Sequence, residues 1–157
     1  MHKHLIIILF ILLCVNFKTI EKFTREKLIY KCFNKELLDS FKDYEKNSLI
    51  LKNEKGVLYL TPIELIDDLP YVPFSSGGMF LNNLCVDPDF RKKGYAIDLI
   101  NKAIEKTVKL NRNYILCQIK NKNKKSMNLF KNKFNFSVLE DALSEDYENF
   151  QYLVKFL

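Results

Sequence analysis

The stretch from Leu84 to Leu110 constrains this chain more than any other part of its sequence. It begins with a short apolar segment, passes through Asp87-Pro88-Asp89 and the basic loop Arg91-Lys92-Lys93-Gly94, and continues as an amphipathic helical pattern. A strand that leads through such a loop into a helix leaves the first N–H groups of the helix without intrahelical acceptors, at the positive end of the helix dipole. The stretch therefore predicts a phosphate-binding site.

The residue types in the loop agree with this prediction. Arg91, Lys92 and Lys93 add positive charge, and Gly94 lets a ligand approach the backbone more closely than a side chain would allow. The spacing of the glycines differs from that of a Walker A loop and from that of the Rossmann fingerprint. The structural alternative is a plain glycine turn before a basic helix.

The spacing of Val86, Pro88, Arg91, Gly94 and Ala96 resembles the coenzyme-binding signature of the GNAT superfamily of acyl-CoA N-acyltransferases. The resemblance extends over about residues 28–157 in the order of the predicted elements. It implies an α/β fold of the mixed (α+β) type, in which helices flank a central mixed sheet of about six or seven strands. Two parallel strands at the centre of that sheet are expected to splay apart.

The resemblance also implies an activity, the transfer of an acetyl group from acetyl-CoA to a primary amine by direct attack. The acceptor is expected to be a small-molecule amine or a peptide amine. The backbone of the central strand would hold the pantetheine arm, the loop before the helix would hold the pyrophosphate, and Asn123 would hold the thiol end. The cofactor-binding residues implied are Leu84, Cys85, Val86, Arg91, Lys92, Lys93, Gly94, Tyr95, Ala96, Asn123 and Phe130.

Two departures from the family pattern bear on catalysis. Phe130 stands where the family often has a tyrosine that protonates the leaving thiolate, and the segment from Lys131 to Phe136 is one residue longer than usual. No glutamate stands on the predicted central strand, which has Asn82 and Asn83 instead. The resemblance therefore assigns no general base. The candidates are Glu64, Asp67 and Asp68 acting through water, with Tyr147 or Tyr152 as the acid.

Length and charge bound the alternatives. With 157 residues and a net charge of +6, the chain predicts one domain, residues 21–157, after an apolar segment at residues 1–20. Thirteen basic residues and two acidic ones lie between residues 91 and 133, so the basic charge surrounds the predicted phosphate site. A polyanion such as coenzyme A fits this distribution. A nucleic-acid-binding module is disfavoured because no aromatic stacking motif is present, and an acyl-CoA-binding domain that has lost catalysis is the other alternative.

The N-terminal segment is the second unusual feature. Leu5 to Val15 is an apolar run of eleven residues without a small-residue cleavage site after it. We expect an uncleaved anchor or surface-inserted segment that contacts a membrane through residues 5–17 and leaves the domain facing the cytoplasm. A signal sequence and a buried first strand are the alternatives.

The cysteines and histidines exclude several kinds of site. The spacing of the four cysteines shows no pairing, and their neighbours in the sequence are apolar: Cys14, Cys32, Cys85 and Cys117. This pattern predicts buried thiols in a reducing compartment. The histidines are His2 and His4, both in the N-terminal tail, so histidine-based metal or triad chemistry is disfavoured and no metal site is expected.

The remaining pattern predicts the order of the elements. Strands are expected at residues 28–33, 48–52, 57–65, 79–87, 114–119, 136–139 and 150–156, and helices at 35–44, 94–110 and 121–134. A long loop is expected at residues 66–78 and an acidic one at 140–148. Because a helix connects them, the strands at 79–87 and 114–119 should be parallel neighbours.

Overall fold

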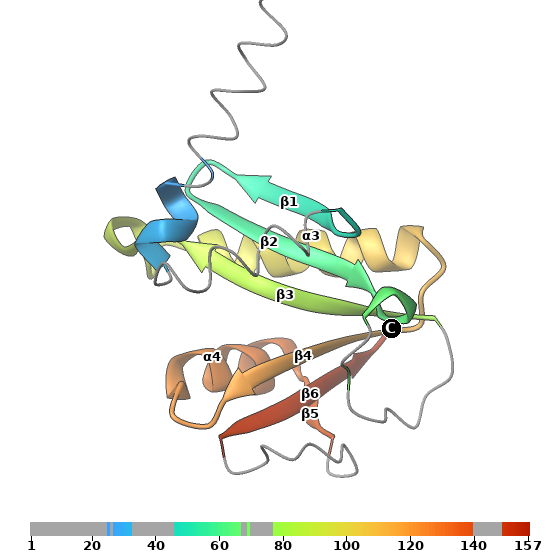
Figure 1. Ribbon diagram of the computed structural model, residues 1–157. Coiled ribbons are helices and arrows are strands. Elements are labelled where there is room, and N and C mark those ends of the chain that lie inside the picture. The colour runs from blue at the N-terminus through green and yellow to red at the C-terminus, as the bar shows by residue number, and fades with distance from the viewer. Residues whose placement is uncertain (1–24, 26, 33–45, 67–68, 70–76, 140–148) are drawn as a thin grey trace, which may run out of the picture.

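The computed structural model describes residues 25, 27–32, 46–66, 69, 77–139 and 149–157. In these residues six strands form one mixed sheet in the order β1-β2-β3-β4-β6-β5 (Figure 1). Helix α3 covers one face of the sheet, and the N-terminal helical residues lie over the opposite face. This arrangement confirms the predicted mixed α/β fold.

The sheet begins with an antiparallel hairpin. Strand β1 (Leu49–Asn53) pairs with β2 (Gly56–Pro62), and a short 3-10 helix (Ile63–Leu65) follows. At Gly56 a Cβ atom would lie 2.8 Å from both the Cys85 carbonyl oxygen and Leu99 Cδ1, so only glycine fits between β3 and α3 here. Residues 54 and 55 form the turn between the two strands.

A strand, a helix and a strand then form the centre of the fold. Strand β3 (Gly78–Val86) leads into α3 (Tyr95–Lys109), which leads into β4 (Tyr114–Lys120), and β3 and β4 are parallel as predicted. Helix α3 buries one stripe of apolar side chains in the main core, with Leu99, Ile100 and Ala103 fully buried. The amphipathic pattern of the sequence thus fixes which face of α3 meets the sheet.

The C-terminal part closes the sheet. Helix α4 (Lys124–Asn128) continues as a π-helical turn (Leu129–Lys133), and β5 (Ser137–Val138) then pairs with the long β6 (Phe150–Phe156). A π turn contains more residues than an α turn, so it accommodates the extra residue noted before Phe136. The Phe136 N–H donates to the Phe130 carbonyl across this turn.

One predicted strand is wrong. Residues 27–32 are helical, whereas residues 28–33 had strand composition. Ile29 is buried, and Leu28 and Cys32 pack beside it against the sheet, while Tyr30 is 60% exposed. Burial of Ile29 and Cys32 on one side, with Tyr30 on the other, is the spacing of a helix. A segment of six residues is too short for the periodicity of its apolar residues to distinguish a helix from a strand.

Several expectations fall outside the described residues. These are the apolar segment at 5–17 with its membrane contact, the helix at 35–44, most of the loop at 66–78 and the acidic loop at 140–148, which all stay predictions. Within the part of the chain that is described, no helix is long and apolar enough to cross a membrane.

Candidate active site

The two central strands separate part of the way along their length. Strands β3 and β4 pair from Gly78 with Tyr114 to Leu81 with Cys117, and the register ends there. Beyond this point the strands diverge, as Figure 1 shows. The edge of β3 that faces β4 therefore has no strand partner among the described residues from Asn82 to Val86, and its backbone groups can bind an extended ligand. The expected splay of the central strands is present.

A β-bulge lies at the start of this opening. The register between β2 and β3 shifts between the pairs Val57–Cys85 and Tyr59–Asn82, and Asn83 has a φ of 48°. Asparagine tolerates this left-handed conformation better than most residues. Because of the extra residue, Leu84 packs with the core beneath α3 instead of on the opposite face. The sequence signal for the bulge is the pair Asn82-Asn83, which interrupts the continuous apolar run of the strand.

The loop between β3 and α3 has the geometry of an anion site. A 3-10 helix (Pro88–Phe90) follows β3, and the loop then turns through left-handed conformations at Lys92 (φ 62°) and Gly94 (φ 89°). No side chain caps α3, whose first helical bond runs from Asp98 N to Gly94 O at 3.0 Å. A Cβ atom at Gly94 would meet nothing within 4 Å, so open space lies against the backbone. An uncapped helix N-terminus beside open space fits a phosphate group.

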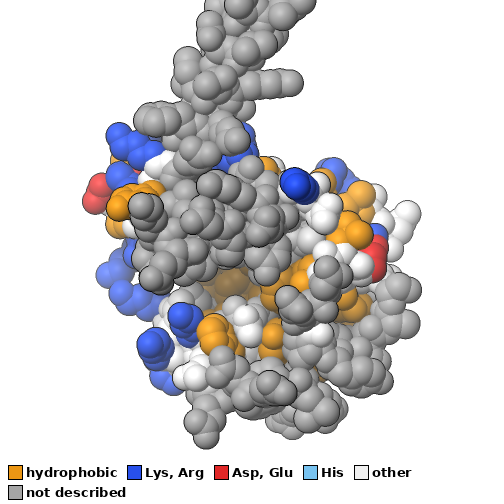
Figure 2. Space-filling view, in the orientation of Figure 1, with side chains coloured by type: hydrophobic (Ala, Val, Ile, Leu, Met, Phe, Trp, Pro, Cys, Tyr) orange, Lys and Arg blue, Asp and Glu red, His pale blue; other side chains and the backbone are white. Residues whose placement is uncertain are grey.

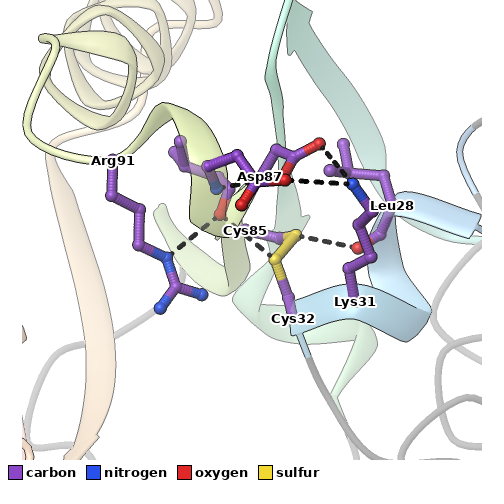
Figure 3. A network of polar contacts seen from close by, with 8 residues as sticks. Leu28, Lys31, Cys32, Cys85, Asp87 and Arg91 are labelled. Atoms are coloured by element: carbon purple, nitrogen blue, oxygen red, sulfur yellow. Dashed lines mark hydrogen bonds and ion pairs between the residues drawn. A yellow bond between two sulfur atoms is a disulfide. The ribbon is translucent and has the colours of Figure 1, made fainter.

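Charged side chains surround this loop. The Arg91 Nε–H donates to the Val86 carbonyl at 3.2 Å (Figure 3), which attaches the guanidinium to the end of β3. Lys55 and Lys93 lie over the Phe90 ring at 4.3 and 5.0 Å from its centroid. Lysine and arginine side chains gather along the edge of the molecule where β3 ends and α4 begins (Figure 2). The positive charge predicted for a polyanionic ligand thus lies beside the loop.

The prediction of reduced thiols is wrong for two cysteines. Cys32 and Cys85 form a disulfide, with Cα atoms 5.9 Å apart and a sequence separation of 53 (Figure 3). The spacing of the two cysteines carries no sign of this bond, because the pair joins two elements that only the fold brings together. Cys117 is a buried free thiol, and burial raises its pKa far above the usual range. Cys117 is therefore not a nucleophile at neutral pH.

A row of uncharged polar side chains crosses the sheet on the face opposite α3. Asn82 is buried, and its Nδ2 donates to Thr61 Oγ1 at 2.8 Å. Thr61 Oγ1 lies 2.6 Å from Ser48 Oγ. Across the opening Gln118 Nε2 donates to the Tyr152 hydroxyl at 2.9 Å. Asn82 and Gln118 each follow the last residue of their strand that takes part in the β3–β4 pairing, so they flank the point where these two strands part.

The structure gives structural roles to the two family positions in the C-terminal half. Asn123 caps α4, its Oδ1 accepting from Ser126 N at 3.2 Å. Phe130 is 3% exposed and packs edge-on against Phe136 in the main core, with ring centroids 5.1 Å apart. Phe130 can contribute an apolar wall and no proton.

The weak catalytic candidates are not brought together. Glu64 lies at the end of the sheet opposite the phosphate loop. There its carboxylate accepts two hydrogen bonds, at 2.6 and 2.9 Å, from Arg112, which stands two residues before β4. This contact lowers the pKa of Glu64. Asp67, Asp68 and Tyr147 lie outside the described residues. Tyr152, in contrast, is placed at the opening by its contact with Gln118.

Glu64→Gln is expected to change kcat by no more than about twofold, because an ion-paired carboxylate with a lowered pKa is a poor base. It should lower stability at pH 7 by up to about 1 kcal/mol. A lowered pKa stabilises the fold above the unfolded value, so this contribution is lost as the pH falls through the folded value. Thermal unfolding at pH 7 and at about pH 3 should show the difference between variant and wild type shrinking. A tenfold fall in kcat would instead assign Glu64 to the reaction.

Comparison with known proteins identifies the family. A model of the acetyltransferase (GNAT) family matches residues 23–136. The protein is therefore an acyl-CoA-dependent N-acyltransferase with acetyl-CoA as its cosubstrate. The chain belongs to the acetyltransferase (GNAT) family. No curated protein is significantly similar to this chain in sequence.

Solved structures show the same fold. An IAA acetyltransferase from Bacillus cereus is 17% identical, with a TM-score of 0.63, 83% of this chain and 91% of that one being covered. A Bacillus subtilis acetyltransferase in complex with CoA is 18% identical, with a TM-score of 0.57 and 79% and 84% coverage. A ribosomal-protein-alanine N-acetyltransferase from Brucella melitensis is 16% identical, with a TM-score of 0.54 and 76% and 78% coverage.

Proposed function

We propose that this protein transfers an acetyl group from acetyl-CoA to a primary amine by direct attack of the amine on the thioester. The observation that carries the proposal is the uncapped N-terminus of α3, with open space at Gly94, beside the unpaired edge of β3. The loop suits a pyrophosphate, and the strand edge suits a chain of amide groups. Both ligand features occur together in acyl-CoA.

The residues of this chain divide the binding between them. Backbone N–H groups of Lys93 to Ala96 hold the pyrophosphate, with positive charge from Lys92 and Lys93 nearby. The β3 edge from Leu84 to Val86 bonds to the pantetheine arm and places the thioester near the bulge. The arm then lies in the opening between β3 and β4, above the apolar core that includes Phe130.

The acceptor amine approaches from the face opposite α3. Asn82 and Gln118 each direct their amide NH2 group to a hydroxyl, so the side-chain oxygens are left to accept N–H groups of the amine. Neutral acceptors orient an amine without stabilising its ammonium form as a carboxylate would. In the reaction the new N–C bond forms, the S–C bond breaks and the amine loses a proton, while the thiolate gains one to become the coenzyme thiol.

The experiment that tests the function combines binding with turnover. Calorimetry of the full chain with acetyl-CoA should give micromolar affinity, and a panel of spermidine, D-glucosamine and a tripeptide should reveal acetylated product by mass spectrometry. Tight coenzyme binding with no product from any amine would contradict the enzymatic function and support the weakened binding domain. No binding by folded protein would contradict both.

Asn82→Ala is expected to raise KM for the best amine of the panel about tenfold, because one hydrogen bond to the amine is lost. The dissociation constant for acetyl-CoA should not change. Gln118→Ala should have the same effect across the opening. The measurement is steady-state kinetics with the amine varied at saturating acetyl-CoA.

Ser48→Ala is the matched control for the Asn82 variant. It removes the contact at the far end of the same hydrogen-bonded row and leaves Asn82 in place. Wild-type KM is expected for this variant. Equal effects from Ser48→Ala and Asn82→Ala would show that the row is only structural.

A further inference from the structure

The disulfide connects an N-terminal helix to the strand proposed to hold the coenzyme. Cys85 lies in β3 and is 1% exposed, whereas Cys32, at the end of the helical residues 27–32, is only partly buried. Cys85 is one of the residues whose backbone lies at the proposed pantetheine position. A change at this sulfur pair therefore acts within the proposed acetyl-CoA site.

The surroundings of the sulfur atoms suit the dithiol as well as the disulfide. Cys32 Sγ lies 3.4 Å from the Val86 carbonyl oxygen, and Cys85 Sγ lies 3.5 Å from the Leu28 carbonyl oxygen. In the reduced form each S–H group has one of these oxygens as an acceptor. Ile29, Val57 and Tyr59 form the apolar cluster around Cys85, which suits a buried thiol. Reduction thus leaves no buried donor without an acceptor.

The same contacts reach the phosphate loop. The Val86 carbonyl that lies beside Cys32 also accepts from Arg91, and Lys31 forms an ion pair with Asp87 at 3.0 Å (Figure 3). Asp87 in turn caps the 3-10 helix that begins the loop. In the dithiol form the described helical residues are held to β3 by noncovalent contacts alone: the packing of Leu28 and Ile29, the two S–H···O contacts and the exposed ion pairs of Lys31.

We propose that Cys32 and Cys85 are a reversible oxidation site that controls acetyl-CoA binding. The disulfide form holds the end of β3 and the start of the loop in the binding geometry. The dithiol form binds the coenzyme more weakly, because binding then has to order these segments and part of the binding free energy is lost to that ordering. The inference rests on the proposed acetyl-CoA site.

The redox step is a thiol–disulfide exchange with glutathione. A glutathione thiolate attacks the sulfur of Cys32, the less buried of the two cysteines, the S–S bond breaks, and the electron pair leaves on Cys85, which takes a proton. A second glutathione attacks the mixed disulfide and releases the Cys32 thiol with glutathione disulfide. Two electrons pass from two glutathione molecules to the protein pair, and glutathione disulfide drives the reverse reaction.

The test compares the two redox forms of the full chain. One sample of protein is equilibrated with glutathione disulfide and another with excess glutathione, and the glutathione is then removed from each. Part of each sample is alkylated, and peptide mass spectrometry reports whether Cys32 and Cys85 are oxidised or reduced. The dissociation constant for acetyl-CoA, measured by calorimetry on matched samples without alkylation, should be about tenfold higher in the reduced form. Equal constants for fully oxidised and fully reduced folded protein would overturn the proposal.

Two variants separate this effect from general damage. Cys32→Ser should bind with the affinity of the reduced form under both conditions, and its partly exposed position favours folding without the bond. Cys117→Ala, which alters the buried cysteine outside the disulfide, should retain the response. A redox response that persists in Cys32→Ser would also overturn the proposal. Absence of acetyl-CoA binding in both forms of wild type would instead contradict the proposed function.

Discussion

Gly94→Glu is expected to weaken acetyl-CoA binding by at least about 100-fold, which corresponds to about 2.7 kcal/mol. Gly94 has a φ of 89°, and a residue with a side chain costs about 1–2 kcal/mol in that conformation. The new side chain would also extend into the open space at the N-terminus of α3 and place a negative charge near the phosphates. Calorimetry with acetyl-CoA measures the loss.

Two further glycine variants isolate the cause. Gly94→Ala adds the backbone strain without the charge and should weaken binding about tenfold. Gly77→Ala adds strain at another positive φ, 125°, at the end of β3 away from the loop. Its melting temperature should fall while its affinity stays that of wild type. Wild-type affinity in folded Gly94→Glu protein would show that the coenzyme binds elsewhere.

Cys32→Ser is expected to lower the free energy of unfolding by about 4 kcal/mol. The disulfide closes a loop between residues 53 apart in sequence, and a cross-link over that length removes about this much conformational freedom from the unfolded chain. Urea unfolding of oxidised wild type and of the variant should show the difference as a shift in midpoint with a similar slope.

Reduced wild type is the control for the serine substitution itself. With excess reductant its midpoint should move to that of Cys32→Ser, because both then lack the same cross-link. An oxidised wild type that unfolds at the midpoint of the variant would show that the bond does not form in solution. In that case the redox dependence of acetyl-CoA binding would also be absent.

The elements around α3 were predictable because their causes are local. The turn before Gly94, the amphipathic stripe of α3 and the apolar runs of β3 and β4 each lie within a continuous segment. The parallel pairing of β3 with β4 followed from the helix between them. For the same reason the positions of the phosphate loop and of the open β3 edge could be proposed from sequence.

Other features depend on contacts between distant segments. The strand composition of residues 28–33 gave no indication that Ile29 would dock on the sheet as part of a helix, because tertiary packing overrides a weak local preference. The bond between Cys32 and Cys85 depends on that docking. The positions of Asn82 and Gln118 depend on the strand register, which has no local signature beyond the polar pair Asn82-Asn83 within an apolar run.

The sequence by itself thus determined the fold class, the glycine loop before α3 and the coenzyme, since backbone conformation and helix dipole follow from a few adjacent residues. Only the tertiary structure decided that Cys32 lies against Cys85, that Glu64 is held by Arg112 away from the opening, and that Asn82 and Gln118 flank it. The physical reason is chain entropy: bringing distant segments together depends on the total burial of the core, which no single segment encodes.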